Sequence, residues 1–273
     1  MKKKLISVFI LLLFISCERQ TLWPLQNSSN DLIVVDGIIT DEFKFQSVHL
    51  SYPVNSLNEK PQPITGAAVI ISDEDSAYTL TEQIANSGMY YSDRKFAARL
   101  RKNHSLIINV YNKVYSAKAT MLPCKPFTGF RYSKNNSDDL YHVDWVASAF
   151  NSDKPAMWEL IMDWSHVTGY EHTDTSLCKI RMLFYTLPTL DVSEIFAPEM
   201  ERISFPAGTT VTERKYSLTP EHAEFIRELL SVTNWRGGLF DTAPSNITTN
   251  LSSGAVGFFG ACAVLSVTTT INP

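Results

Sequence analysis

The sequence predicts a mainly β protein of two domains with a single α-helix. Apolar and polar residues alternate at period two through much of the 273-residue chain, which is the pattern of strands with one buried face. Clusters of turn residues separate these segments, and one stretch has the 3.6-residue period of a helix. Hydrophobic residues reach 44% and charged residues only 19%, so the composition is that of a folded protein with a large core.

The N-terminus has the features of a lipoprotein signal peptide at residues 1–16. Lys2–Lys4 form a basic start, and Leu5–Ile15 is an apolar run that is shorter than the ~20 residues of a membrane-spanning helix. A small residue then precedes Cys17, so the junction resembles a bacterial lipobox, in which the cysteine becomes the lipidated N-terminus. We therefore expect acyl chains on Cys17 to anchor the protein. The alternative is an ordinary secretory signal with an incidental cysteine.

Cleavage before Cys17 would leave an acidic mature chain. The leader takes three of the 24 basic residues and leaves 21 against 28 acidic ones, a net charge of −7. This charge gains nothing from anionic lipids, so the acyl chains would provide the attachment, and it excludes nucleic acid as a partner. Glu18 stands where an inner-membrane retention signal would have aspartate, which favours the outer membrane. Residues 17–30 are expected to be the lipidated cysteine and a polar tether.

Residues 31–121 are predicted to form an N-terminal β-sandwich. The apolar positions that alternate along its strands are Val48, Leu50 and Tyr52; Val69 and Ile71; Leu106, Ile108 and Val110; and Tyr115, Ala117 and Ala119. Its predicted turns are Asp36-Gly37, Asn86-Ser87-Gly88 and Tyr111-Asn112-Lys113. The two prolines of Leu122–Pro126 mark a domain boundary, because the alternation stops there.

Residues 127–273 are predicted to form a larger antiparallel sheet or barrel with one helix packed on it. Strands with one polar face are expected at 141–149, 158–164 and 178–184. A helix over 219–235 is indicated by Thr219 as N-cap and Pro220 at the first helical position. Its apolar stripe contains Ala223, Ile226 and Leu230. The uncharged stretch 254–267 is expected to be a buried strand whose glycines allow bends or close strand contacts.

Several motifs resemble a known family. They are Asp31–Gly37, Pro63–Val69 followed by Gly88-Met89-Tyr90, Tyr216–Glu221, Gly238–Ile247 and Gly257–Ala261. Together they are similar to the Bacteroidota lipoprotein family named domain of unknown function 4249, and the second resembles a carboxypeptidase-regulatory-like, or transthyretin-like, β-sandwich. The resemblance implies a secreted lipoprotein, often encoded beside a TonB-dependent outer-membrane transporter, with no assigned catalytic residues. Thr242-Ala243 departs from the prolines that are commoner in the family.

One segment gathers the residue types that bind transition metals. His166, Glu171, His172, Asp174 and Cys178 lie within thirteen residues. Their spacing matches no known zinc motif, and a polar hairpin loop is the simpler interpretation. We therefore predict no metal and no other cofactor, with His166, His172 and Asp174 as weak candidate ligands.

Three cysteines remain after lipidation of Cys17. Cys124 and Cys178 are the preferred disulfide pair, because the first lies in the predicted hinge and the second opens a strand. Three unpaired thiols are the alternative. Cys262 lies in the apolar stretch and is expected to be an inert buried thiol.

Aromatic residues provide the candidate ligand-binding site. Trp145, Trp158 and Trp164 are expected on two strands, and such rings bind carbohydrate and peptide, although a tryptophan-rich core is the alternative. Phe240 and Asp241 belong to a long loop, 239–250, that suits either a binding loop or a crossover.

The carboxylates of Glu159 and Asp163 do not indicate a glycosidase. On one strand face they would lie roughly 13 Å apart, beyond the ~5–9.5 Å of glycosidase pairs, and a solvated face is expected instead.

No nucleophile elbow or acid–base motif is present in the sequence. The leading hypothesis is therefore a non-enzymatic outer-membrane lipoprotein. It would bind a small-molecule, peptide or glycan ligand, or dock on a TonB-dependent transporter, a partner that only the resemblance implies. The alternatives are a membrane-anchored hydrolase acting on glycans or peptides, and a surface adhesin.

Overall fold

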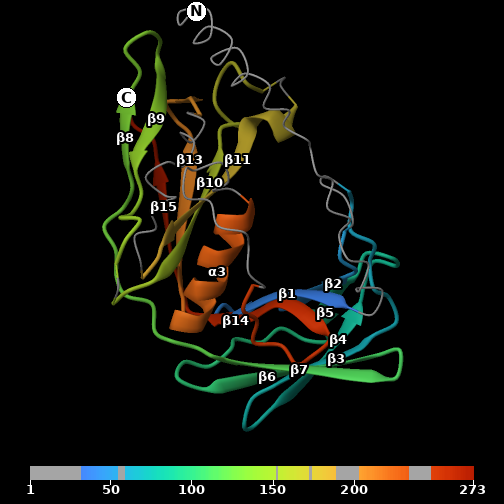
Figure 1. Cartoon of the computed structure of the whole chain (residues 1–273). Helices are drawn as coiled ribbons and strands as arrows, with labels where there is room; N and C mark the ends of the chain where they lie inside the picture. Colours follow the sequence, from blue (N-terminus) through green and yellow to red (C-terminus); the bar gives the residue numbers. More distant parts are fainter. Residues whose placement is uncertain (1–31, 55–58, 152, 172–173, 189–202, 234–246) are drawn as a thin grey trace, which may run out of the picture.

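The structure confirms a mainly β fold with one packed α-helix. The computed structural model describes residues 32–54, 59–151, 153–171, 174–188, 203–233 and 247–273. Its strands form sheets of eight, four and three strands. Figure 1 shows the eight-stranded sheet across the bottom of the molecule, the four-stranded sheet standing above it, and helix α3 (Pro220–Thr233) in front of the standing strands.

The eight-stranded sheet, here the curled sheet, contains the first block of the chain and one strand from its end. Its spatial order is β14 (Ala255–Cys262), β1 (Ile33–Thr40), β2 (Ser47–Ser51), β5 (Met89–Ser92), β4 (Ala77–Glu82), β3 (Ala68–Ser72), β6 (Asn103–Val110) and β7 (Lys113–Thr120). The predicted alternation is confirmed. The apolar positions Val48, Leu50, Val69, Ile71, Leu106 and Ile108 are all buried in one core.

Two of the three predicted turns in this sheet are confirmed. Asn86 and Gly88 have φ of 60° and 69° between β4 and β5, and Tyr111 and Asn112 have φ of 52° and 59° between β6 and β7. The turn predicted at Asp36-Gly37 is wrong, because both residues lie inside β1. Glycine at position 37 allows close packing with the neighbouring strand, because a Cβ there would lie 3.0 Å from Val48 Cγ2.

The two edge strands of the curled sheet, β7 and β14, are brought together by one side chain. Asn250 Nδ2 donates to Lys118 O in β7 at 2.9 Å and to Phe259 O in β14 at 2.7 Å, and Asn250 Oδ1 accepts from Phe259 N at 3.1 Å. A bridge between Ala117 and Leu251 adds a second connection. The sheet is therefore a nearly closed barrel, which protects most of its edge groups.

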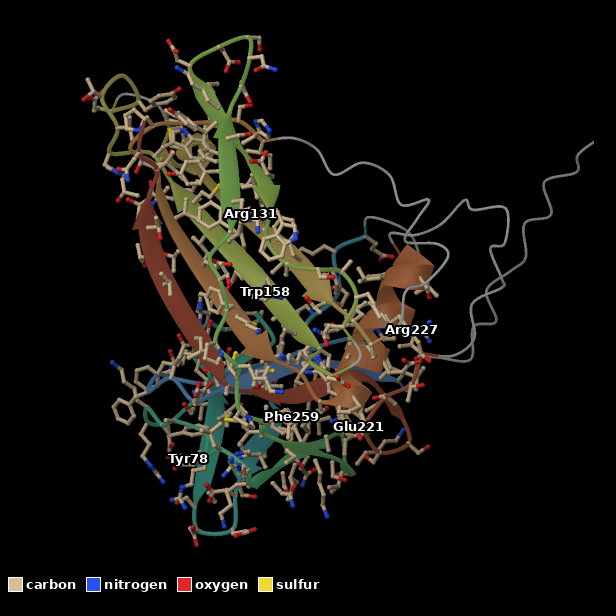
Figure 2. All side chains as sticks on the ribbon, turned by 90° about the vertical axis from the view of Figure 1, so that its left-hand side faces the viewer. Tyr78, Arg131, Trp158, Glu221, Arg227 and Phe259 are labelled. Carbon is tan, nitrogen blue, oxygen red and sulfur yellow. The ribbon has the colours of Figure 1, made fainter. Side chains whose placement is uncertain are left out.

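The other two sheets pack on one another. The four-stranded sheet, here the upright sheet, has the order β11 (Lys179–Thr186), β10 (Ala156–Asp163), β13 (Thr210–Ser217) and β15 (Val264–Thr270). The small sheet has the order β12 (Phe205–Pro206), β9 (Leu140–Trp145) and β8 (Arg131–Lys134). Their shared core includes Trp158, Leu160 and Phe205. Figure 2 shows Trp158 within these upper sheets and Phe259 in the curled sheet below.

The uncharged stretch 254–267 divides between two sheets. β14 pairs in parallel with β1 over eight residues, from Ile33↔Ala255 to Thr40↔Cys262. After Ala263 the chain enters β15, which pairs with β13 in the upright sheet and is largely exposed. The prediction of a buried strand is correct for β14 and wrong for β15.

Helix α3 begins as predicted and packs where the two larger sheets meet. Thr219 Oγ1 accepts a hydrogen bond from His222 N at 3.2 Å, the contact of an N-cap. Ala223 and Ile226 are buried with Met157 of β10 and Cys262 of β14. The structure describes the helix up to Thr233. The remainder of the predicted helix, 234–235, lies outside the described residues.

An ion-pair cluster around the buried carboxylate of Glu159 also joins the curled sheet to the upright sheet. Glu42, after β1, accepts from Arg214 Nη2 at 2.6 Å, and Arg214 Nη1 lies 3.4 Å from Glu159 Oε2. Tyr216 Oη donates to the same Glu159 oxygen at 2.6 Å, and Arg181 contacts the other. Glu159 is only 3% exposed, so the prediction that it belongs to a solvated face is wrong. Burial alone would raise its pKa, but these hydrogen bonds and arginine charges outweigh burial and lower it.

The contact between β14 and β1 depends on Gly257, which has φ of 98° and where a Cβ would lie 2.1 Å from Val35 O. We expect Gly257→Ala to destabilise the protein through both backbone strain, about 1–3 kcal/mol, and overpacking, about 1–3 kcal/mol more. Gly66→Ala is the matched control, because Gly66 has φ of 70° with open space around its Cβ and should cost strain alone. Urea unfolding of the two variants measures the difference. Equal losses would show that the close contact between the strands is unimportant.

His222 in helix α3 predicts an acid-sensitive stability. Burial lowers its pKa from 6.5 to about 4, so at intermediate pH a proton binds the unfolded chain but not the folded one. Protonation of His222 costs the folded protein nothing above about pH 6.5. As the pH approaches 4, it lowers the free energy of unfolding by up to about 3 kcal/mol. We expect His222→Gln to flatten this part of the stability curve, and His166→Gln, at an exposed site, to leave it unchanged. An unaltered slope in the first variant would contradict the assignment.

Candidate functional site

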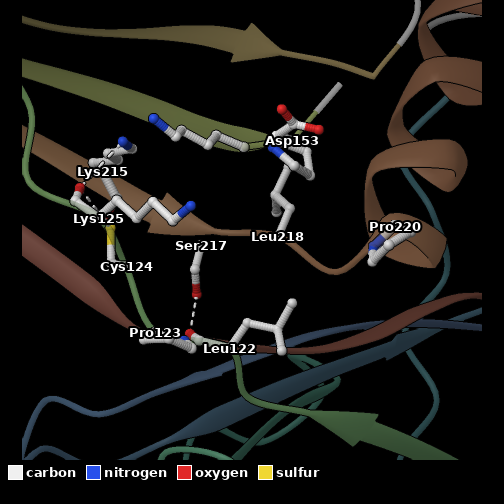
Figure 3. Close-up of a pocket in the computed structure, with 11 residues that line it drawn as sticks. Leu122, Pro123, Cys124, Lys125, Asp153, Lys215, Ser217, Leu218 and Pro220 are labelled. Atoms are coloured by element: carbon white, nitrogen blue, oxygen red, sulfur yellow. Dashed lines mark hydrogen bonds between the residues drawn. The ribbon is translucent and has the colours of Figure 1, made fainter. Parts of the chain in front are cut away.

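A cavity of about 300 Å³ lies where the linker after the curled sheet crosses the base of the upright sheet. Three segments line it: the linker at 122–125, the loop before β10 at 153–155, and the end of β13 with the start of α3. Figure 3 shows Lys125 and Lys215 at one end of this junction cavity and Leu218 and Pro220 at the other. The volume is at the lower limit of small-molecule sites, which measure about 300–1,000 Å³.

The floor of the junction cavity is fixed by the hydroxyl of Ser217. Ser217 Oγ donates to Leu122 O at 2.7 Å and accepts from Ala263 N at 2.9 Å. One side chain therefore ties the linker to the crossing between β14 and β15 (Figure 3). Because both interactions of the hydroxyl are with the backbone, Ser217 holds the walls of the cavity together and is not placed as a nucleophile.

Lys215 is the buried charge of the cavity. Its side chain is 8% exposed, its Nζ donates to Lys125 O at 3.2 Å, and the same Nζ lies 4.7 Å from the centre of the Trp158 ring. Burial lowers the pKa of Lys215, and the charges of Lys154 and Lys125 add to this effect, although the charges of Cys124 and Glu213 oppose it. An anion in the cavity would relieve both effects.

The thiol of Cys124 lies beside this lysine and is not activated. Cys124 Sγ contacts Lys215 O at 3.5 Å, and burial raises the pKa of the thiol although the charge of Lys215 opposes the shift. A thiol with a raised pKa is a poor nucleophile. No histidine is among the described residues that line the cavity. The residues present can bind and orient a ligand, and they do not form an acid–base or nucleophilic set.

The predicted disulfide is not formed in this structure. Cys124 and Cys178 are both free thiols, the first at the junction cavity and the second in the core between the upright and small sheets. Cys262 is also free, and burial raises its pKa to about 12. Cys17 lies outside the described residues.

The three predicted tryptophans do not form one surface. Trp158 and Trp164 are 5% and 8% exposed and belong to the core of the upper sheets. Trp145, at the end of β9, is 39% exposed and has the Arg131 guanidinium 5.3 Å from its ring centre. Trp158 does not line the junction cavity, but its ring contacts the ammonium group of Lys215, which does. Phe240 and Asp241 lie outside the described residues.

Two of the candidate metal ligands contact backbone groups. His166 Nε2 lies 3.1 Å from Gly208 O, and Asp174 accepts from Ser176 N at the start of the short 3₁₀ helix η1 (Thr175–Cys178). His172 is outside the described residues. Within the described part of the chain, no group of three His, Cys, Asp or Glu side chains is placed to hold a metal ion.

The junction cavity itself was not predicted. Strand 210–217 reads as TVTERKYS, and its mixed polarity hides the fact that Glu213 and Lys215 face the core between the sheets. The sequence offers only a weak signal for the cavity: Lys215 lies two residues before Ser217, on the same face of a strand without turn residues. Lys125 can be recognised in the sequence as a basic residue of the linker. Its neighbours in the sequence do not indicate that it contacts Lys215, 90 positions later.

In the described residues, no helix has the length and apolar character that crossing a membrane requires. No curated protein matches the chain. The family model described as "Domain of unknown function (DUF4249)" matches residues 22–268, which is nearly all of the sequence after the predicted leader. On that match, the chain belongs to the DUF4249 family.

Proposed function

We propose that this protein is a lipid-anchored lipoprotein of the outer membrane that binds a small ligand in the junction cavity and acts as a non-enzymatic accessory of a TonB-dependent transporter. The observation that carries the binding role is the cavity itself. It combines apolar walls with a buried ammonium group that lacks a carboxylate partner within the described residues. Such a combination of apolar surface and few polar groups is typical of ligand sites.

The position of the cavity supports an accessory role. Its walls come from the linker, the upright sheet and the start of α3, so a bound ligand would contact both halves of the molecule. A ligand that bridges two parts favours the arrangement in which they are docked, and so can be sensed by a partner. The transporter as that partner is supported by the resemblance of the sequence to lipoproteins encoded beside such transporters.

The anchor predicts the behaviour of Cys17 variants. In cells given a palmitate analogue, we expect the wild type to be labelled and to sediment with membranes. Cys17→Ser should lose the label and be released, because no acyl chain would hold it. Cys124→Ser is the matched control and should keep both properties, since this thiol lies at the junction cavity. Labelling of Cys17→Ser would show that the lipobox assignment is wrong.

The accessory role predicts a large partner in the outer membrane. We expect the tagged full-length protein, extracted in a mild detergent, to co-purify with a transporter of the TonB-dependent class, identified by mass spectrometry. The same bait carrying Cys17→Ser is the control and should recover less of it, because the bait no longer resides at the membrane. Purification of the wild-type bait with no such transporter would overturn this part of the proposal.

A further inference from the structure

The junction cavity gathers three ammonium groups, and one carboxylate is among the described residues that line it. Lys125, Lys154 and Lys215 all line it, and none of them forms an ion pair within the described residues. Burial is the largest cause that lowers the pKa of Lys215; the charges of Lys154 and Lys125 also lower it, and those of Cys124 and Glu213 oppose the shift. One carboxylate, Asp153, also lines the cavity, so the site keeps an excess of positive charge.

The buried carboxylate on the same strand face does not pair with Lys215. Glu213 Oε2 accepts from Phe130 N at 3.1 Å, while Glu213 Oε1 has no hydrogen-bond partner in the part of the chain that the structure describes. Burial raises the pKa of Glu213, which favours its uncharged form. Among the described residues, the Lys215 ammonium group has one carbonyl acceptor and one aromatic face for its three N–H donors. A buried ammonium with so few acceptors is expected to bind an anion.

Most of the remaining wall is apolar. Leu122, Pro123, Pro155, Leu218 and Pro220 line the cavity opposite and beside the lysines. Inorganic phosphate would satisfy the charges but would leave these side chains facing water. A ligand with a charged head and an apolar body would satisfy both parts of the wall.

We infer that the junction cavity binds an organic carboxylate with a short apolar body, its carboxylate on Lys215 and Lys125 and its body against the leucine and proline side chains. This inference rests on the proposed function, since it names the ligand of the same cavity. Lysine suits the role because its ammonium is a point charge that accepts a carboxylate in several orientations.

The test is calorimetric titration of the full chain carrying Cys17→Ser with straight-chain carboxylates from acetate to octanoate. We expect affinity to rise about fourfold per methylene until the cavity is filled. Lys215→Met should lower the affinity for octanoate at least tenfold, and Lys125→Met should lower it less, because Lys125 is exposed. Lys60→Met, an exposed lysine remote from the cavity in sequence and absent from its lining, should change nothing. If Lys215→Met fails to fold, the loss in Lys125→Met still tests the inference.

Titrations with octanamide and with inorganic phosphate distinguish failure of this inference from failure of the proposed function. Octanamide that binds as tightly as octanoate would overturn the anion inference and leave the binding role of the cavity intact. Inorganic phosphate that binds tightly, with no gain from chain length among the carboxylates, would overturn the carboxylate class. If none of these ligands binds, the inference is wrong, and recovery of the transporter by the tagged lipoprotein then decides separately whether the accessory role stands.

Discussion

The arrangement of the molecule depends on one crossing of the chain near its C-terminus. Cys262 ends β14 in the curled sheet and Val264 begins β15 in the upright sheet, so Ala263 alone separates strands of two different sheets. The crossing is hydrogen-bonded on both sides: Ser217 N donates to Ala263 O at 3.0 Å, and Asp41 Oδ1 accepts from Val264 N at 2.8 Å. With so short a connection, the two sheets have little freedom to rotate against one another.

The junction cavity is a product of this constraint. The linker must run from β7 past the crossing, and Leu122 pairs with Cys262 as it does so. Lys125 is thereby carried to the end of β13, where Lys215 points between the sheets. The ion pairs of Arg214 with Glu42 and Glu159 hold β13 from its other face. The two faces of β13 thus have different roles: on one face Arg214 forms ion pairs, and on the other Lys215 forms none with the described residues.

The local features of the fold could be predicted from the sequence, and the non-local ones could not. Alternation located the buried faces of β2, β3, β6 and β7, and Thr219 with Pro220 located the helix start, because each signal lies within a few residues. The parallel pairing of β1 with β14 joins residues more than 200 positions apart, and no periodicity records it. For the same reason Glu159 was expected in water and Lys215 was not singled out, since burial of a charge depends on partners from distant strands.

The pairing of β1 with β14 also orders events during synthesis. The first strand of the curled sheet pairs with a strand that is made more than 200 residues later, and the barrel stays open on that side until then. Contacts between such distant segments form slowly, because a long loop must close before they stabilise the chain. The curled sheet is therefore completed only after β10, β11 and β13 of the upright sheet have been made, although its other seven strands all come before them in the chain.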